Sequence, residues 1–527
     1  MGVASVRSVA LRGAMGHLIE VQADVSDGVV GTSIVGRVDS ALSESRERVR
    51  MAIVNGLYEW PSSKRVTVLL SPADLPKSGS HFDLAIAVAV MAATGQVEAR
   101  GFESTAFIGE LTLAGNLRSV HGVLPMVLAA LKAGLRSVIV PQPQVDEARM
   151  VPGIDVSGVE SLAQVVALMR AEPRPDAPPV PPLGGDNVLS WRGSDRLEEM
   201  DMADLIGLQD VRFAMEVAAA GGHHILLSGP KGCGKTSIAE RIPGILPDLE
   251  PEEAVEITAV RSLAGVLDPR LGLETRPPFL APHHDASKAS VVGGGTGRVR
   301  PGQISLAHAG VVFLDEFPLF RNDVVQALRE PLENGDITIA RGDEMVTLPA
   351  RSIVVLAANP CPCGNFYPRA QSRCTCRETE RRDYRGKVSG PIADRIDITR
   401  NLLPFGGIAG DGAGAEDSAT IRARVVEARS RQIRRYVDES WRLNAQAPGV
   451  ALRQRWPLAG GAQDLVDKAV LAGHLTLRGA VRVHRLAMTV ADLAGRDLPD
   501  EGCVDTALRL RSGEALKVSQ LTRSVPL

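Results

Sequence analysis

The sequence is poor in aromatic residues, which make up 3% of its 527 positions, and it contains only six cysteines. Cysteine usage this low excludes a disulfide-stapled secreted scaffold. No apolar run approaches the roughly 20 residues that a membrane-spanning helix needs. The first residues are interrupted by Arg7, Arg12 and glycines, so they form no signal-peptide core. These absences predict a cytoplasmic protein with reduced cysteines and no membrane partner.

An excess of charge of one sign is also missing. The chain has 59 lysines and arginines against 62 aspartates and glutamates, which gives a formal net charge of −3 and a pI near 6.4. No global positive field therefore attracts nucleic acid. Any contact with DNA must come from a local basic patch.

The chain is too long for one hydrophobic core, and about three domains are expected. Residues 172–190 are rich in proline and glycine and predict an extended linker. A second loose stretch, Gly406–Glu416, is rich in glycine and alanine. We therefore expect an N-terminal domain over residues 1–171, a core over 191–405 and a C-terminal helical lid over 417–515.

The first domain alternates short β-like runs with helical ones. Arg65–Leu70 and Ser137–Val140 are typical of strands, whereas Leu84–Ala93 and Met126–Ala133 are typical of helices. This alternation predicts an α/β layer. From residue 418 onward the sequence is rich in Arg, Ala and Leu with a helical period, which predicts the lid helices.

The core contains three short apolar runs that end at polar residues: Ile225–Leu227, Val311–Leu314 and Ile353–Leu356. Buried parallel strands have this pattern. Ligands of such sheets bind at the carboxyl ends of the strands. The sequence therefore predicts an α/β core with a parallel sheet and a site along one of its edges.

A glycine-rich loop follows the first of these runs and leads into a helical segment. It consists of Gly229, Pro230, Lys231, Gly232, Cys233, Gly234, Lys235 and Thr236. Glycines let backbone N–H groups turn inward around phosphate oxygens, and a helix N-terminus adds a favourable dipole. Lys235 is expected to contact the β- and γ-phosphates of ATP, and the Thr236 hydroxyl to bind Mg²⁺. A chance match is the alternative, and the strand–loop–helix context argues against it.

Polar side chains end the other two runs. Asp315 and Glu316 follow one strand, and Asn359 follows the other. Asp315 is expected to hold Mg²⁺ through water, Glu316 to polarise the attacking water, and Asn359 to orient that water. Two arginines complete the set as hypotheses: Arg395 as a finger inserted into a neighbouring subunit's site, and Arg478 as a γ-phosphate contact from the lid. A surface ion pair is the alternative for either arginine.

Four of the six cysteines lie in residues 361–376. Cys361 and Cys363 form one close pair, and Cys374 and Cys376 form another. Four thiolates at this spacing suit a tetrahedral Zn²⁺ site, although the C-x-C pairs are tighter than usual. Redox disulfides and an iron–sulfur cluster are the alternatives.

The segment around these cysteines is basic and contains interleaved aromatics. Its cations are Arg369, Arg373, Arg377, Arg381, Arg382, Arg385 and Lys387, and its aromatics are Phe366, Tyr367 and Tyr384. Such a segment can neutralise phosphates and stack on unpaired bases, which predicts single-stranded or branched DNA as a partner. A plain solvated face is the alternative. Lys288, Arg298 and Arg300 are further candidates.

Several stretches resemble the ComM/YifB family of magnesium-chelatase-like AAA+ ATPases in order and spacing. They are Ala219–His224, Ala281–His284, Val292–Gly295, Pro301–His308 and Ala357–Gly364. The resemblance covers about residues 1–515 and departs at Lys231 and Cys233, where the family has smaller or neutral residues. It implies a ring, expected to be a hexamer, and supports the finger role of Arg395 and the sensor role of Arg478.

The resemblance also implies the substrate. ComM-like members are branch-migration helicases that aid recombination of single-stranded DNA in natural transformation. An ATPase subunit of a magnesium-chelatase-like complex stays open as the alternative, because the AAA+ core is common to both. The cysteine cluster, the basic segment and the N-terminal domain favour DNA.

The N-terminal domain resembles a Lon-protease-like domain through Pro76–Asp83, Ile108–Leu111 and Val140–Pro141. A Lon protease needs a serine nucleophile and a lysine base in hydrogen-bond reach. Where the motif places the serine this chain has His81, and where it places the lysine it has Leu124. Leucine cannot accept a proton, so the domain is expected to lack peptidase activity and to serve as a scaffold or a binding surface.

Overall fold

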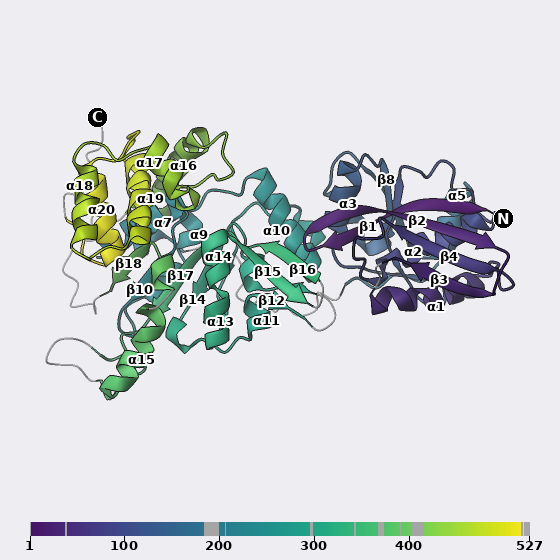
Figure 1. The fold of residues 1–527 in the computed structure, drawn as a ribbon, viewed down its shortest axis with the longest axis horizontal. Helices are drawn as coiled ribbons and strands as arrows, with labels where there is room; N and C mark the ends of the chain where they lie inside the picture. Colours follow the sequence, from purple (N-terminus) through teal and green to yellow (C-terminus); the bar gives the residue numbers. More distant parts are fainter. Residues whose placement is uncertain are drawn as a thin grey trace.

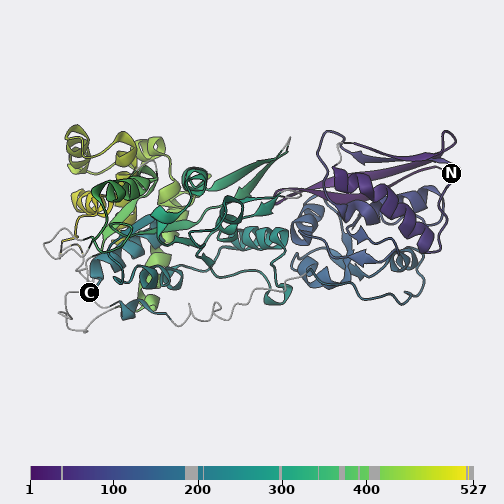
Figure 2. The same ribbon diagram turned by 90° about the horizontal axis from the view of Figure 1, so that it is seen from below.

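The computed structural model describes residues 2–36, 39–183, 200–205, 207–295, 299–341, 344–366, 374–389, 392–402, 416–517 and 520. The molecule is elongated, with the N-terminal domain at one end, the lid helices at the other and the parallel-sheet core between them (Figure 1). The view from below shows the same three regions in the same order (Figure 2). Among the described residues, no helix is long and apolar enough to span a membrane.

The N-terminal domain is built on a seven-stranded mixed sheet with strand order β3-β4-β2-β1-β5-β8-β9. The strands are β1 (Val3–Arg12), β2 (Met15–Ser26), β3 (Gly31–Val35), β4 (Arg65–Ser71), β5 (Thr105–Phe107), β8 (Ser137–Pro141) and β9 (Asp155–Val159), and β6 (Glu110–Leu111) pairs with β7 (Leu117–Arg118) beside it. β1 and β2 form a long antiparallel hairpin. One face of β2 is buried at every second residue, as expected for a strand with one face on the core.

Helices cover this sheet. They are α1 (Ser40–Asn55), α2 (Asp83–Ala93), α3 (Val123–Lys132), α4 (Val145–Arg149) and α5 (Leu162–Met169). All but one residue of α2 are buried, so its nearly continuous apolar sequence is that of a central helix. The strand and helix predictions at β4, β8, α2 and α3 are confirmed, as is the α/β class.

The first part of the proline-rich stretch packs on the N-terminal domain. Val180 is buried and belongs to the core cluster of that domain. The Ser119 hydroxyl donates to the Pro181 carbonyl at 2.7 Å, and the Gln164 amide donates to the Pro175 carbonyl at 3.0 Å. Up to residue 183, the predicted linker is therefore an extended segment that side chains of the N-terminal domain hold in place.

The core contains a five-stranded parallel sheet of order β11-β14-β17-β10-β18. Its strands are β10 (Ile225–Ser228), β11 (Phe279–Leu280), β14 (Val311–Leu314), β17 (Ile353–Ala358) and β18 (Ile398–Asn401). Leu314 pairs with Leu356, and Ser228 pairs with Ala358. This register brings the residues that follow β10, β14 and β17 to one edge of the sheet.

Helices alternate with the strands of this sheet along the chain, and most of them are labelled in Figure 1. They are α7 (Gln209–Gly221), α8 (Lys235–Ala239), α9 (Ile242–Ile245), α10 (Pro251–Ala264), α11 (Lys288–Val291), α12 (Gln303–Leu306), α13 (Asn322–Ala327), α14 (Arg329–Asn334) and α15 (Glu378–Ser389). The core also contains two antiparallel hairpins. One pairs β12 (Gly293–Gly294) with β13 (Arg300–Pro301), and the other pairs β15 (Asp336–Arg341) with β16 (Glu344–Pro349).

The N-terminal domain docks on the core through α10 and the β15–β16 hairpin. Leu11 packs against Leu263 and Leu348 in a small apolar cluster. At the same interface the buried Glu147 carboxylate accepts from the Ser262 hydroxyl at 2.5 Å and from the Leu124 backbone N–H at 2.9 Å. A polar contact of two buried groups therefore supports the apolar one.

The C-terminal region is helical, as predicted. Its helices are α16 (Ser418–Arg435), α17 (Gly449–Arg455), α18 (Ala462–Leu471), α19 (Leu477–Leu493) and α20 (Glu501–Ser512). Apolar faces of α16, α19 and α20 belong to the same core cluster as β10 and β17. The lid is thus packed directly on the parallel sheet that carries the glycine-rich loop.

Candidate nucleotide-binding site

The glycine-rich loop runs from the end of β10 to the start of α8. Gly232 and Gly234 have φ values of +77° and +84°, in the left-handed region that favours glycine. Gly234 is the residue before the helix, so the loop turns sharply and α8 begins at Lys235. Such a turn leaves the backbone N–H groups at the start of the helix available to an anion.

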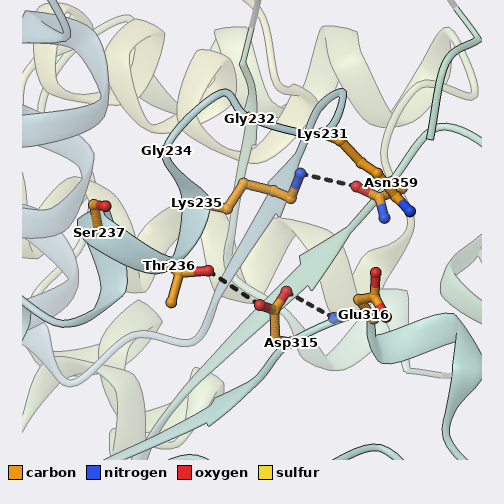
Figure 3. Close-up of a pocket in the computed structure, with 9 residues that line it drawn as sticks. All are labelled: Lys231, Gly232, Gly234, Lys235, Thr236, Ser237, Asp315, Glu316 and Asn359. Atoms are coloured by element: carbon orange, nitrogen blue, oxygen red, sulfur yellow. Dashed lines mark hydrogen bonds between the residues drawn. The ribbon is translucent and has the colours of Figure 1, made fainter.

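Lys235 lies under the loop and joins it to the next strand. Its Nζ donates to the Gly229 carbonyl at 2.8 Å, to the Pro230 carbonyl at 2.9 Å and to Asn359 Oδ1 at 3.0 Å. The dashed line to Asn359 in Figure 3 marks the last of these contacts. Lys235 and Asn359 are both less than a tenth exposed.

Asp315 links the acidic strand to the loop. The Thr236 hydroxyl donates to Asp315 Oδ2 at 3.0 Å, and the Glu316 backbone N–H donates to Asp315 Oδ1 at 2.8 Å. Glu316 has a φ of +48°, a left-handed conformation that is rare for a residue with a side chain. Strain of this kind costs on the order of 1–3 kcal/mol and clusters at functional sites. Here it turns the Glu316 side chain along the pocket (Figure 3).

Together these residues line one pocket of about 360 Å³. Its lining consists of Lys231, Gly232, Gly234, Lys235, Thr236, Ser237, Asp315, Glu316 and Asn359. A cationic amine, the backbone N–H groups at the start of a helix and a hydroxyl next to a carboxylate are the donor set that a magnesium-bound triphosphate requires. The residues present therefore fit ATP and Mg²⁺.

The two departures from the usual loop sequence have different surroundings. Cys233 is buried beneath the loop, and its thiol donates to the Pro230 carbonyl at 2.9 Å. It packs in the core cluster rather than lining the pocket. Lys231 is exposed at the mouth of the pocket, beside Asn359 (Figure 3).

The two candidate arginines lie outside this pocket. Arg395 forms an ion pair with Glu333 at 2.7 Å, and its side chain is 13% exposed. Arg478 is exposed in the first turn of α19. A single chain thus does not bring either arginine to the lysine and the carboxylates.

A buried polar network connects the segments that carry these arginines. Asp397 accepts from Arg482 at 2.5 Å and lies 3.3 Å from His223 Nδ1, while His223 Nε2 lies 2.8 Å from the Thr489 hydroxyl. Burial opposes the charged form of Asp397, but Arg482 and His223 hold its pKa below the ordinary value. Sequence reasoning missed this link. Arg482, one helical turn after Arg478, was its only local signal.

The four cysteines of the predicted metal site come together. The distances between sulfurs are 3.3 Å for Cys361 and Cys363, 3.7 Å for Cys363 and Cys374, and 3.6 Å for Cys374 and Cys361. All four sulfurs, including that of Cys376, lie within 4.8 Å of one another. Zinc–sulfur bonds of about 2.3 Å at tetrahedral angles require sulfurs about 3.8 Å apart. The arrangement therefore fits a tetrahedral thiolate site.

The basic segment is only partly described, because Tyr367, Arg369 and Arg373 lie outside the described residues. Its other cations lie on or next to α15, which projects from the core (Figure 1). The guanidinium groups of Arg381 and Arg385 lie 4.5 and 4.7 Å from the centre of the Phe366 ring. Tyr384 is buried, so the expectation that it stacks on bases is wrong. Lys288 and Arg300 are exposed, and Arg298 is not described.

The residues at the two Lon dyad positions lie in the protein interior. His81 is buried and its Nε2 hydrogen-bonds to the Val9 carbonyl at 2.9 Å, and Leu124 is buried in an apolar cluster. The Ser80 hydroxyl donates to a Glu110 carboxylate oxygen. Lys77 is also buried, with its amine on the Pro72 carbonyl.

Comparison with known proteins agrees with this geometry. Family models described as "Magnesium chelatase, subunit ChlI", "Subunit ChlI of Mg-chelatase" and "Magnesium chelatase, subunit ChlI C-terminal" match residues 201–405, 21–144 and 415–511. The chain is 42% identical to an uncharacterised protein of Mycobacterium tuberculosis over 511 residues, which is 97% of this chain and 99% of the relative. A Lon protease of Roseiflexus castenholzii is 26% identical over 187 residues, which is 33% of this chain and 23% of the protease.

Two further relatives carry family names. The competence protein ComM of Haemophilus influenzae is 36% identical over 499 residues, 94% of each chain. The protein YifB of Escherichia coli is 36% identical over 520 residues, 98% of this chain and 99% of the relative. Identity at this level over nearly the whole length, together with the P-loop site, decides the assignment. The chain belongs to the ComM/YifB family of magnesium-chelatase-like AAA+ ATPases.

Proposed function

We propose that this AAA+ ATPase is a DNA motor, a ComM-like branch-migration helicase that works as a hexameric ring and aids recombination of single-stranded DNA in transformation. The observation that carries the proposal is the direct connection between the nucleotide pocket and the projecting helix α15, which carries Arg381, Arg382, Arg385 and Lys387. The likeness to a competence protein over 94% of both chains supports the same direction.

The pocket supports a division of labour among its residues. Lys235 and the loop N–H groups hold the phosphates, while Thr236 and Asp315 hold Mg²⁺ when it is bound, which supplies charge neutralisation of the phosphates. Glu316 accepts the proton of the attacking water, and the Asn359 amide orients that water. The strained backbone at Glu316 keeps its carboxylate on the pocket side of the strand end.

Arg395 and Arg478 act on sites that only a ring completes. Arg395 exchanges its ion pair with Glu333 for the phosphates of a neighbouring subunit, and exposed Arg478 contributes the lid contact. Removal of Arg395 therefore lowers hydrolysis and spares nucleotide binding. Normal turnover of Arg395→Ala would reject the finger role.

Zn²⁺ is the metal we propose for the four-cysteine cluster. Sulfur-only donors in a compact tetrahedral arrangement favour Zn²⁺ over oxygen-seeking metals. The cluster holds the start of α15 against the core, so the metal fixes the basic helix on which DNA binds. Elemental analysis of purified protein measures this directly, with one zinc per chain expected.

The decisive experiment compares ATP hydrolysis by the full chain alone, with single-stranded DNA, with a four-way junction and with duplex DNA, at a fixed salt concentration. We expect single-stranded DNA and the four-way junction to stimulate ATP hydrolysis. We also expect the protein to move the junction in an ATP-dependent assay. Arg381→Glu/Arg382→Glu on α15 removes positive charge and is expected to abolish the stimulation and to spare basal hydrolysis. Arg321→Glu, an exposed cation in the turn before α13, is the matched control.

A rate of ATP hydrolysis that none of these DNAs changes would reject the DNA proposal. The same result, together with a stable complex with other chelatase subunits, would favour a role in a magnesium-chelatase-like complex, since the matched family models bear that name. The nucleotide site would stand in either case.

A further inference from the structure

The four-cysteine cluster lies against the nucleotide site. Cys361 follows Asn359 after a single proline, and its side chain is fully buried. Asn359 is the residue whose amide oxygen accepts from Lys235 at 3.0 Å. The segment that binds Lys235 is thus the same segment that begins the cluster.

A second contact joins the cluster to the glycine-rich loop. The Lys231 backbone N–H donates to the Gly364 carbonyl at 3.4 Å, and Gly364 in turn donates to the Cys361 carbonyl at 2.9 Å. Gly364 has a φ of +77°, and a Cβ on it would lie 2.5 Å from Lys231 Cγ. Only glycine allows the loop and the cluster to approach this closely.

The other cysteine pair leads into α15, which packs back on the same site. Tyr384 is buried beside the Asn359 backbone N–H, and burial raises the pKa of Tyr384 to about 12, so the hydroxyl stays protonated. Arg385 Nε donates to the Pro360 carbonyl at 3.2 Å. α15 also contacts the turn Phe317–Leu319 that directly follows Glu316.

We propose that the metal-loaded cluster is a positioning element of the ATPase site, so that metal content sets the rate of hydrolysis. With the metal bound, Cys361 and Cys374 hold the Asn359 segment and α15 at a fixed separation. When the metal leaves, the two segments come apart, and Asn359, Lys231 and the turn after Glu316 lose a common support. This inference rests on the proposed zinc site and ATPase roles, and it adds regulation of hydrolysis by metal.

The direction of the effect follows from what the cluster touches. Lys235 and Thr236 lie on α8, and the loop before them starts from β10, so nucleotide affinity changes little. Asn359 and Glu316 act on the attacking water, whose placement is sensitive to shifts well below 1 Å. Metal loss should therefore lower kcat and leave nucleotide affinity nearly unchanged.

The experiment measures zinc content, affinity for a fluorescent ATP analogue and ATP turnover on the full-length protein. Cys374→Ala/Cys376→Ala is compared with Cys503→Ala, a buried cysteine of the lid outside the cluster. We expect the double variant to lose zinc and at least about tenfold in kcat, with affinity within about threefold of the wild type. The control should keep zinc and turnover.

Two further measurements keep the proposal falsifiable if the double variant fails to fold. Chelation of zinc from the wild type should lower kcat, and added zinc should restore it. Tyr384→Phe removes only one hydroxyl, and it should lower kcat while zinc content stays at the wild-type value.

Each failure has its own signature. Loss of zinc with unchanged kcat would overturn the positioning role and leave the zinc site and the ATPase intact. Wild-type protein that hydrolyses ATP without any metal in the cluster would overturn the zinc proposal and this inference with it. Wild-type protein without hydrolysis would overturn the proposed function itself.

Discussion

Two regions of the molecule share one local plan, a strand that leads through a glycine-containing loop into a helix. β10, the loop and α8 form one example, and β4, residues 72–82 and α2 form the other. In the first, Thr236, Asp315 and Glu316 are partly exposed and line a pocket. In the second, His81 is buried and hydrogen-bonded to backbone, and Leu124, the other position of the Lon dyad, is buried on α3.

This difference in exposure shows how a functional site can be distinguished from a motif without the reactive residues. The polar groups at the glycine-rich loop bind one another in a way that a triphosphate and a metal can replace. Lys235 donates to two loop carbonyls and to Asn359, and Thr236 donates to Asp315. The residues at the Lon dyad positions are enclosed in the core, where His81 bonds to the Val9 carbonyl. Residues that line a pocket and have partners a ligand can replace serve chemistry, whereas residues enclosed in the core serve stability.

The largest expected effect tests the intact site. Glu316→Gln keeps the volume and the hydrogen-bonding ability of the side chain but removes its basicity. ATP turnover should fall by roughly 10²–10⁴-fold while ATP binding persists, because proton acceptance from water is lost. Turnover by malachite-green phosphate release and binding by a fluorescent ATP analogue measure the two properties.

Glu110→Gln is the matched change in the Lon-like domain. Glu110 accepts a hydrogen bond from Ser80 there, as Glu316 faces the pocket in the core. ATP turnover should stay at the wild-type value. A large drop for Glu110→Gln, or normal turnover of Glu316→Gln, would remove the contrast between the two regions.

The second effect concerns the attempt to rebuild a peptidase. His81→Ser/Leu124→Lys restores the residue types of the Lon dyad, but position 124 is only 1% exposed. An unpaired ammonium buried there should destabilise the domain by roughly 3–5 kcal/mol. Chemical denaturation followed by intrinsic fluorescence measures the loss. A stable double variant that cleaves casein would contradict the view of this domain as a scaffold.

The third effect depends on pH. Burial lowers the pKa of His224 to about 4, and its Nδ1 accepts from the Val354 N–H at 3.1 Å, which requires the neutral ring. Below the ordinary histidine pKa near 6.5, His224 is protonated in the unfolded chain but stays neutral in the folded chain. Stability from this group is therefore complete above pH 6.5 and is lost as pH falls toward 4, by about 3 kcal/mol in total.

His224→Asn isolates that contribution, because the Asn Oδ1 can accept from Val354 and does not titrate. The stability difference between wild type and variant should shrink or reverse as pH falls from 7 to 4. A difference that stays constant over this range would show that His224 does not titrate as a buried neutral ring. Thermal melts at closely spaced pH values provide the comparison.

Much of the core could be predicted because its signals are local. Runs such as Val311–Leu314 are apolar and end at charged residues, so they indicate both a buried parallel strand and a ligand edge. The long β1–β2 hairpin was not predicted, although β2 alternates buried and partly exposed residues from Ile19 onward. Arg7 and Glu20 belong to the partly exposed positions and pair across the two strands. Strand order and register depend on contacts between distant segments, which no local pattern contains.

The site follows the same rule. Asp315 and Asn359 directly follow recognisable runs, and Lys235 ends the glycine-rich loop that follows a third. Their shared edge follows from parallel strands. The buried partners of Asp397 could not be predicted, because His223 and Arg482 come from segments far apart in the chain. The role of Tyr384 was predicted wrongly, since a tyrosine in a basic segment has the same local pattern whether it faces solvent or the core.

The smallest expected effect tests how the two regions are joined. Ser262→Ala removes the hydroxyl that donates to Glu147 at the docking interface, and burial already raises the pKa of Glu147. Glu147 keeps the Leu124 N–H as a donor, so the cost should be about 1–2 kcal/mol.

Because the apolar contacts of Leu11 with Leu263 and Leu348 remain, the domain should stay docked but open more often. Hydrogen exchange in α3 and α10 should then speed up by about tenfold, with exchange in β10 and β17 unchanged. Ser430→Ala, whose hydroxyl donates within α16 at the surface, should change neither. Hydrogen exchange that speeds up equally in both domains would mean that the N-terminal domain and the ATPase core unfold as one unit. The N-terminal domain would then contribute to the stability of the ATPase core rather than dock on it as a separate body.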